Sequence, residues 1–201
     1  MPGLFCVLPN SSLIQIAPYQ HLVVVMSIVL GLSVTQLLKG LAQLYRTRNR
    51  VRPYWLHTAW IVLLVFYSLV LWWVHWNYRS IEEWSFFRFV LYLSPMIVFY
   101  FLTSIVIPDS SDPVSDNREH YFSSRVSFFG IFALQLVLAH GAGIIVRGLP
   151  LMDPSDPLRI AMVVLLLVAM RSASARVHAV VLTLFALVLV AFVAIFHSRL
   201  G

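Results

Sequence analysis

The sequence predicts an all-α integral membrane protein: one domain (1–201) with six transmembrane helices and both termini on the outer side. Hydrophobic residues make up 60% of the chain and charged residues only 11%, whereas about a quarter of the residues of soluble domains are charged. The stretch 57–78, HTAWIVLLVFYSLVLWWVHWNY, contains no acid, Lys or Arg. It is long enough to cross a hydrocarbon core of about 30 Å as a helix.

The first three helices are predicted at 21–44, 54–77 and 84–107. The basic loop 45–53 follows the first helix, and we expect it in the cytoplasm because positive loops favour that side. Pro95 lies in the middle of the third helix and should kink it. Tryptophans near the helix ends are predicted to anchor at the membrane interfaces; they are Trp55, Trp60, Trp72, Trp73, Trp76 and Trp84.

The remaining helices are predicted at 121–146, 158–175 and 177–196, after a second cytoplasmic loop at 108–120 that is rich in acids and turn formers. The fifth helix is short. Only eleven residues separate Arg159 from Arg171, which is about 18 Å of helix. This segment spans if both arginines extend to the interfaces, and otherwise it is re-entrant. Nine Lys and Arg residues flank the predicted inner side and five the outer side, which favours outer termini.

Composition disfavours several classes of function. The net charge of +6 comes from basic residues between apolar segments, which indicates membrane topology and not nucleic-acid binding. The single Cys6 excludes an intramolecular disulfide or a multi-cysteine metal site. All eight acids fall in predicted loops, so an ion-coupled transporter, which needs an intramembrane carboxylate, is disfavoured. No nucleophile stands beside a His or acid in a recognisable motif, so no enzyme is predicted.

Two sets of intramembrane residues stand out. Small side chains that let helices approach closely are expected to form a packing seam within or between protomers; they are Ser27, Gly31, Thr35 and Gly40. Polar side chains are candidates for a water-contacting pathway; they are Gln36, Lys39, Gln135 and His140. The alternatives are that Lys39 extends to the headgroups and that Gln135 forms a hydrogen bond to another helix.

Six histidines occur in pairs that bracket predicted helices, which raises the hypothesis of a two-haem protein with ligands in two layers. The weak ligand candidates are His57, His75, His120, His140, His178 and His197. Helical geometry puts only His57 and His75 on one face. Interfacial hydrogen bonds are therefore the favoured interpretation of these histidines, and no cofactor or metal site is predicted.

Six stretches together resemble a group of small, uncharacterised bacterial multi-pass inner-membrane proteins. They are residues 27–31, 35–38, 50–57, 72–73, 108–109 and 120–122. The resemblance covers mainly the first 125 residues. It implies location in the inner membrane of a bacterium, and it carries over no activity, cofactor or catalytic residue.

The leading functional hypothesis is a homo-oligomeric channel or passive pathway for ions or small solutes. Without an intramembrane acid, anions or neutral solutes are more plausible than cations. The alternatives are a non-enzymatic subunit or signalling partner of a larger membrane complex, and the haem-binding redox protein. The expected partners are membrane lipid and either further copies of the chain or the other subunits of a complex.

Overall fold

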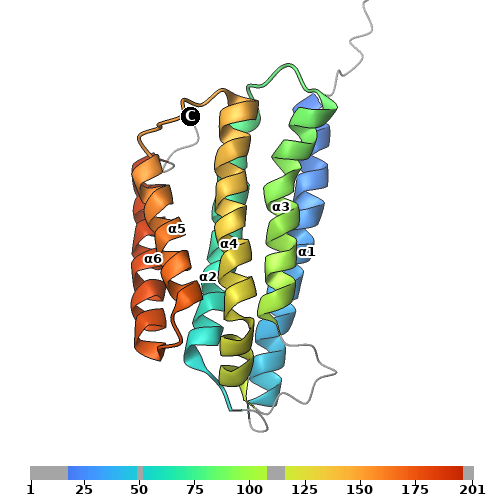
Figure 1. The fold of residues 1–201 in the computed structure, drawn as a ribbon. Coiled ribbons are helices and arrows are strands. Elements are labelled where there is room, and N and C mark those ends of the chain that lie inside the picture. Colours follow the sequence, from blue (N-terminus) through green and yellow to red (C-terminus); the bar gives the residue numbers. More distant parts are fainter. Residues whose placement is uncertain (1–17, 49–51, 108–115, 197–201) are drawn as a thin grey trace, which may run out of the picture.

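The computed structural model describes residues 18–48, 52–107 and 116–196, and within them the chain forms a bundle of α-helices (Figure 1). The helices are α1 (Pro18–Thr47), α2 (Trp55–His75), α3 (Phe86–Val106), α4 (Asn117–Arg147), α5 (Asp156–Arg171) and α6 (Ala175–Phe196). A short 3-10 turn, η1 (Trp76–Tyr78), continues α2. Cys6 and His197 lie outside the described residues.

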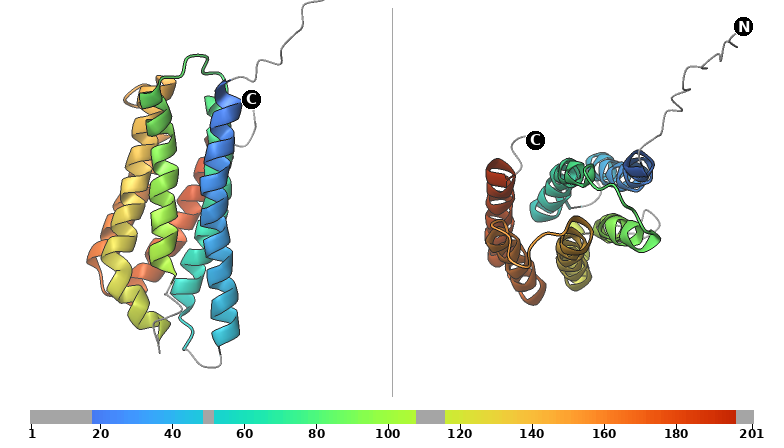
Figure 2. Two further views of the ribbon diagram at one scale, coloured as in Figure 1. Left: turned by 90° about the vertical axis from the view of Figure 1, so that its right-hand side faces the viewer. Right: turned by 90° about the horizontal axis from the view of Figure 1, so that it is seen from above.

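The six helices run alternately up and down. Seen along the bundle, they follow one another round a ring in the order α1, α3, α4, α5, α6, α2 (Figure 2). We call the end at the top of Figure 1 the upper end: α1, α3 and α5 begin there, and α2, α4 and α6 end there. The start of α1 and the end of α6, more than one hundred residues apart in the chain, therefore lie at the same end of the bundle.

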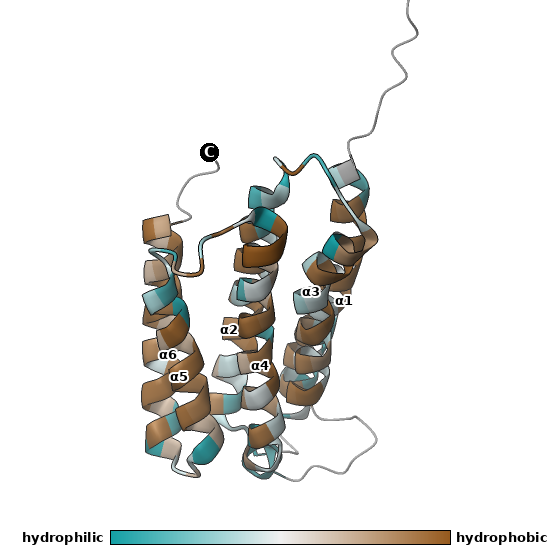
Figure 3. Cartoon of the chain, turned by 45° about the horizontal axis from the view of Figure 1, so that its top comes forward, coloured by the Kyte–Doolittle hydropathy of each residue, from teal (hydrophilic) through white to brown (hydrophobic). Residues whose placement is uncertain are grey.

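Five helices are long and apolar enough to cross a membrane, which makes this a multi-pass membrane protein. They are α1, α2 with η1, α3, α4 and α6. Their outward faces carry large exposed hydrophobic side chains, and polar residues gather towards the ends of the bundle (Figure 3). The shorter α5 is not among the five, although it packs between α4 and α6.

Helix boundaries differ most from the sequence prediction around α4 and α5. Residues 117–120, predicted as loop, form the first turn of α4, because the Asp116 carboxylate caps that helix by accepting a hydrogen bond from the Arg118 backbone N–H (2.8 Å). Residues 172–174, predicted to belong to the fifth helix, form the turn into α6. Ser172 adopts an extended conformation that ends α5 at Arg171.

The centre of the bundle is aromatic. Trp60 on α2 is fully buried and packs against Phe129 of α4 (ring centroids 5.3 Å apart) and Phe185 of α6 (5.7 Å). Predicted as an interfacial anchor, Trp60 instead belongs to this core. Tyr67, two helical turns further along α2, contacts Phe132 of α4 with centroids 5.1 Å apart. Aromatic contacts therefore hold α2 against α4 and α6.

Helix α1 packs against α3 near its lower end. A methyl group at Gly40 would meet the Ile107 side chain at 2.7 Å, whereas one at Gly31 would meet nothing within 4 Å. Gly40 therefore permits the close approach of the two helices. Gly31 and Thr35 are exposed, so this part of the predicted seam does not pack within the protomer. Packing between protomers stays a prediction.

Pro95 lies inside α3 and is buried. Proline has no backbone N–H, so it leaves the carbonyl of Leu91, four residues earlier, without its helical donor. The hydroxyl of Ser94 donates a hydrogen bond to that carbonyl (2.9 Å). The helix thus continues through Pro95, and the predicted kink is untested.

Candidate functional site

A pocket with a polar rim opens at the upper end of the bundle. Its walls come from α2, η1, α3, α4, α5 and α6, and its cavity measures about 70 Å³. This is several times the ~10–15 Å³ that a single water needs. The ionisable side chains that line it are Tyr67, His75, Tyr78, His140, Arg147 and Arg159.

Three charged or titratable groups meet at the rim. Arg159 on α5 donates a hydrogen bond to Asp156 Oδ1 across one helical turn (2.9 Å). The same guanidinium nitrogen lies 3.2 Å from Nδ1 of His140 on α4, and that Nδ1 lies 3.4 Å from Asp156 Oδ1. The Asp156 side chain is only 5% exposed. Asp156 was predicted to lie in the loop before the fifth helix; in the structure it is the first residue of α5 and is buried.

The loop before α5 holds Asp156 in place. Its second carboxylate oxygen accepts a hydrogen bond from the Asp153 backbone N–H (2.6 Å), and its own N–H donates to the Asp153 carbonyl (2.9 Å). Asp153 in turn accepts hydrogen bonds from the hydroxyl and the backbone N–H of Ser155, which hold the pKa of the Asp153 carboxyl below its usual value. Both oxygens of the Asp156 carboxylate are therefore held by hydrogen bonds.

Arg147 supplies a second positive charge to the pocket. It occupies the last turn of α4, where the helix ends at Gly148 in a left-handed conformation (φ 69°). Its guanidinium lies over the Tyr78 ring, 5.5 Å from the centroid. Among the residues that the structure describes, no Asp or Glu forms an ion pair with Arg147. Two guanidinium groups thus line the pocket, and the Asp156 carboxylate that binds Arg159 lies beside it.

The inner part of the pocket reaches the middle of the bundle. The Tyr67 hydroxyl donates a hydrogen bond of 2.7 Å to Gln135 Oε1 on α4, and both residues are buried. The Gln135 amide nitrogen has no hydrogen-bond partner in the structure. Apolar side chains of Val70, Leu71, Leu136 and Leu189 complete the wall. The pocket is therefore polar at its rim and largely apolar inside.

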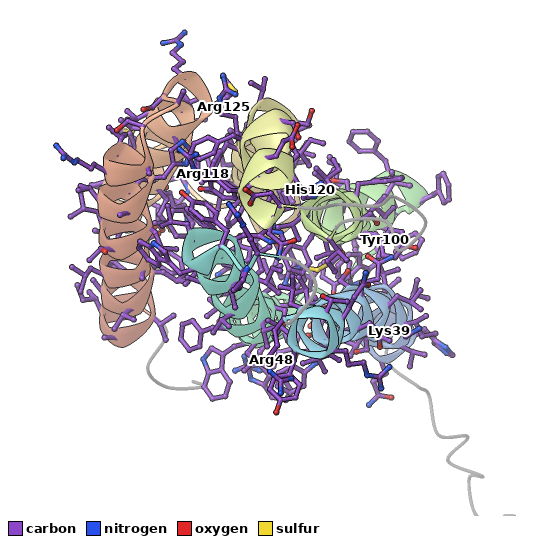
Figure 4. The ribbon with its side chains drawn as sticks, turned by 90° about the horizontal axis from the view of Figure 1, so that it is seen from below. Lys39, Arg48, Tyr100, Arg118, His120 and Arg125 are labelled. Carbon is purple, nitrogen blue, oxygen red and sulfur yellow. The ribbon has the colours of Figure 1, made fainter. Side chains whose placement is uncertain are left out.

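The four residues predicted for a pathway are not brought together. His140 lines the pocket and Gln135 lies behind Tyr67. Gln36 is instead bonded to α3, where its Oε1 accepts hydrogen bonds from Thr103 (2.8 Å) and Ser104 (3.2 Å). Lys39 is exposed on the outer side of α1, as the view from the lower end shows (Figure 4). Gln36 and Lys39 thus lie apart from the candidate site.

The histidines divide between the two ends of the bundle. At the lower end, His57 on α2 lies 2.6 Å from the Val106 carbonyl, and its ring centroid lies 5.7 Å from that of His120. His178 contacts the Tyr121 hydroxyl (2.7 Å) and the Ser172 carbonyl (2.9 Å). These bonds connect α2 to α3 and α4 to α6, which is a structural role.

The described histidines are not gathered into a metal site. The described residues contain no group of three or more His, Cys, Asp or Glu side chains placed to hold a metal ion. At the upper end, Nδ1 of His75 is 2.6 Å from the Leu71 carbonyl, and Nδ1 of His140 contacts Arg159. A cavity of about 70 Å³ has no room for a porphyrin between them. The haem hypothesis therefore gains no support from this arrangement.

Basic side chains also gather at the lower end. Arg118 and Arg125 lie on the side of α4 that faces α5 and α6 (Figure 4). Arg118 lies over the Phe122 ring (5.6 Å), and Arg125 donates to the Phe122 carbonyl (2.7 Å). Burial raises the pKa of the Tyr54 phenol at this end, and the charge of Arg118 opposes that effect.

The remaining predicted interfacial anchors lie towards the ends of their helices. Trp55, Trp72 and Trp76 are 61%, 50% and 41% exposed. Trp73 and Trp84 are partly buried, and the Trp84 indole N–H donates to the Ile81 carbonyl (3.1 Å). Their anchoring in a membrane stays a prediction.

Sequence reasoning identified one of the four rim residues, His140, and missed Arg147, Arg159 and Asp156. A spacing of three residues puts Asp156 and Arg159 on one face of a helix, and that signal was present in the sequence. Nothing in the sequence placed His140, nineteen residues from Arg159, beside them.

Comparison of the chain with protein-family models, curated proteins and solved structures finds no match. The coarse conclusion, a multi-pass helical membrane protein, rests on the helices themselves. The function of the site has to be inferred from its own chemistry.

Proposed function

We propose that this multi-pass membrane protein binds a small organic anion in the upper-end pocket. The observation that carries the proposal is the excess of positive charge: two guanidinium groups face the pocket, and only Arg159 has a carboxylate partner among the described residues. Arg147 is partly buried and its charge acts on the Asp153 carboxyl, but no described carboxylate pairs with it directly. A guanidinium placed in this way favours the binding of a negative group.

The lining indicates which kind of anion fits. Arg147 and Arg159 can each donate paired hydrogen bonds to a carboxylate, sulfonate or phosphate. Below them, Val70, Leu71, Leu136 and Leu189 provide an apolar wall. The small cavity suits a short apolar group behind an acidic head. The same chemistry occurs in a free organic acid and at the headgroup of an anionic lipid, so the experiment has to separate these two sources.

Binding at this place is also the first step of a passive pathway. The pocket extends from one end of the bundle to Tyr67 on α2, and the aromatic contacts of Trp60 lie further along the same helix. Flux across a membrane would require these aromatic contacts to open. Anion binding is therefore the primary proposal, and anion flux is its stronger form.

The test measures binding of propane sulfonate to the full chain in nanodiscs of zwitterionic lipid, by isothermal titration calorimetry. Arg147→Gln is expected to weaken binding about tenfold or more, because a charge-assisted hydrogen bond contributes about 1.5–3 kcal/mol. The matched control is Arg79→Gln. Like Arg147, Arg79 lies at the upper end of the bundle and over an aromatic ring, in this case that of Trp76 (5.1 Å). Unlike Arg147, it does not line the pocket. Its replacement should leave the affinity unchanged.

A second arm addresses lipid. Nanodiscs that contain phosphatidylglycerol are analysed by native mass spectrometry for lipid retained on the protein. Retention that depends on Arg147, without sulfonate binding, identifies the anion as a headgroup. Sulfonate binding that depends on Arg147 identifies a free solute. The proposal is wrong if the parent chain binds neither propane sulfonate nor phosphatidylglycerol. It is also wrong if Arg79→Gln and Arg147→Gln change the affinity for the anion equally.

A further inference from the structure

The His140 Nδ1 atom lies between a group that can only donate and a group that can only accept a hydrogen bond. The Arg159 guanidinium is 3.2 Å away, and the Asp156 carboxylate oxygen is 3.4 Å away. Arg159 can donate to this nitrogen only when Nδ1 has no proton, and Asp156 can accept from it only when Nδ1 has one. A single nitrogen cannot satisfy both contacts at once.

The presence or absence of a proton on Nδ1 therefore decides what Arg159 does, and only the imidazolium form also adds a positive charge. In the neutral ring with its hydrogen on Nε2, Nδ1 accepts from Arg159, which is then held by both His140 and Asp156. When a proton from solvent adds to Nδ1, that acceptor is lost and the imidazolium repels the guanidinium. Nδ1–H now donates to Asp156 and competes with Arg159 for the same carboxylate oxygen. The donors of Arg159 become free to turn towards the pocket.

We propose that the pocket takes up its anion together with one proton, which is held on His140. This inference rests on the proposed anion-binding function. Protonation adds one positive charge to the rim and frees the guanidinium that would hold the anion, so the two binding events favour each other. The proton adds to the Nδ1 lone pair, and no bond of the anion is made or broken.

Other titratable groups face the same space. From α2 and η1 come Tyr67, His75 and Tyr78; from α4, Arg147; and from α5, Arg159. The Asp156 carboxylate binds Arg159 beside the pocket, and the Asp153 carboxyl lies close enough for the charges of Arg147 and Arg159 to act on it. Among the described residues of α6 that line the pocket, Leu189 and Phe192, none titrates. His75 is the other histidine that lines the pocket. Its Nδ1 is engaged by the Leu71 carbonyl of its own helix, and its ring stacks on Tyr78, so its protonation does not displace Arg159.

The experiment uses propane sulfonate, which stays anionic across the pH range in which histidines titrate, about 5 to 8. Calorimetry of the full chain in zwitterionic nanodiscs is repeated at each pH in two buffers of different ionisation enthalpy. The difference in heat gives the number of protons taken up per anion bound. We expect uptake that approaches one proton, and an affinity that falls by up to about tenfold per pH unit as pH rises across this range.

The matched variants are His140→Gln and His21→Gln. His21 is an exposed histidine near the start of α1, at the same end of the bundle, and its replacement should change neither proton uptake nor affinity. His140→Gln should abolish both the proton uptake and the pH dependence. A second readout follows histidine side chains by 15N NMR, in which propane sulfonate should shift the His140 signal towards the protonated form. This readout needs only the parent chain, with His140→Gln used for assignment.

The outcomes separate the two proposals. Sulfonate binding without proton uptake, or uptake that persists in His140→Gln, overturns the proton proposal and leaves anion binding standing. If the parent chain binds no sulfonate at any pH, and retains no anionic lipid in the arm described above, anion binding itself fails and the proton proposal fails with it. Should His140→Gln not fold, the parent chain alone decides: if it binds sulfonate and no histidine signal shifts towards the protonated form, the inference is overturned.

Discussion

At the scale of single residues, buried polar groups join neighbouring helices. Tyr67 donates to Gln135 between α2 and α4, Thr103 on α3 donates to Gln36 on α1, and Tyr121 contacts His178 between α4 and α6. A polar side chain within an apolar bundle needs such a partner, because neither lipid nor apolar side chains can replace water. The sequence indicated that Gln135 was a candidate for such a bond, and the structure supplies its partner.

The Tyr67–Gln135 bond can be tested by substitution. Tyr67→Phe removes the donor and leaves Gln135 Oε1 buried without it, which we expect to lower the free energy of unfolding by about 1 kcal/mol. Thermal or denaturant unfolding in detergent measures this change. The double variant Tyr67→Phe/Gln135→Leu should lose less free energy of unfolding than the two single variants lose together, because neither partner is then left unpaired.

The control for this cycle is Tyr45→Phe, at a tyrosine that is 67% exposed on α1. It also loses one hydroxyl, but no buried partner is left behind. Equal destabilisation by Tyr67→Phe and Tyr45→Phe, or strict additivity in the double variant, would contradict the assigned hydrogen bond.

At the scale of elements, α5 is the helix whose relation to a membrane is least determined by its sequence. Its 16 residues rise about 24 Å, which is less than a hydrocarbon core of about 30 Å. Yet α5 packs along α4 and α6, and the segments on its two sides lie at opposite ends of the bundle (Figure 2). Arg159 at one end and Arg171 at the other can extend to the interfaces.

We therefore expect α5 to cross the membrane. Single cysteines introduced at Leu151 and at Ala173, both exposed, in a chain with Cys6 replaced by Ser, should react with a membrane-impermeant maleimide from opposite sides. Cysteine at exposed Glu82 before α3 is the control, and it should label from the same side as position 151. Labelling of positions 151 and 173 from one side would show that α5 is re-entrant.

At the scale of the whole molecule, one chain already contains a complete rim of Asp156, Arg159, His140 and Arg147. The proposed binding therefore needs no second copy. The exposed Gly31 and Thr35 on α1 nevertheless leave a face on which another α1 could approach closely. Contacts between copies in the predicted homo-oligomer would use surfaces outside the pocket. The same holds for contacts with other subunits in the alternative of a larger membrane complex.

Native mass spectrometry of protein extracted gently from its own membrane distinguishes these assemblies. We expect a whole-number multiple of the 22.9 kDa chain mass, because small side chains facing lipid favour helix association. Gly31→Leu should then reduce this multiple, because the larger side chain keeps a neighbouring helix away. A bare monomer contradicts the oligomer prediction, and additional protein mass favours the subunit alternative.

Much of the fold follows from the sequence because a bilayer imposes simple requirements. Long uncharged stretches must become helices that satisfy their own backbone hydrogen bonds, so the existence, order and approximate limits of the helices can be derived from hydropathy. The ends of α4 and α5 were less predictable, since the cap at Asp116 and the extended Ser172 depend on local side-chain and backbone geometry. Residues 108–115 of the second predicted cytoplasmic loop lie outside the described part of the chain.

The sequence by itself determined that this chain is an all-α multi-pass membrane protein whose polar residues are few. Only the tertiary structure decided which side chains meet. Among the polar ones, His140 meets Arg159 and Asp156, and Tyr67 meets Gln135. In the aromatic core, Trp60 meets phenylalanines of α4 and α6. Hydropathy is a property of each segment, whereas contacts between segments depend on how helices rotate and pack against one another. For that reason the helices could be predicted one at a time, and the pocket that they enclose could not.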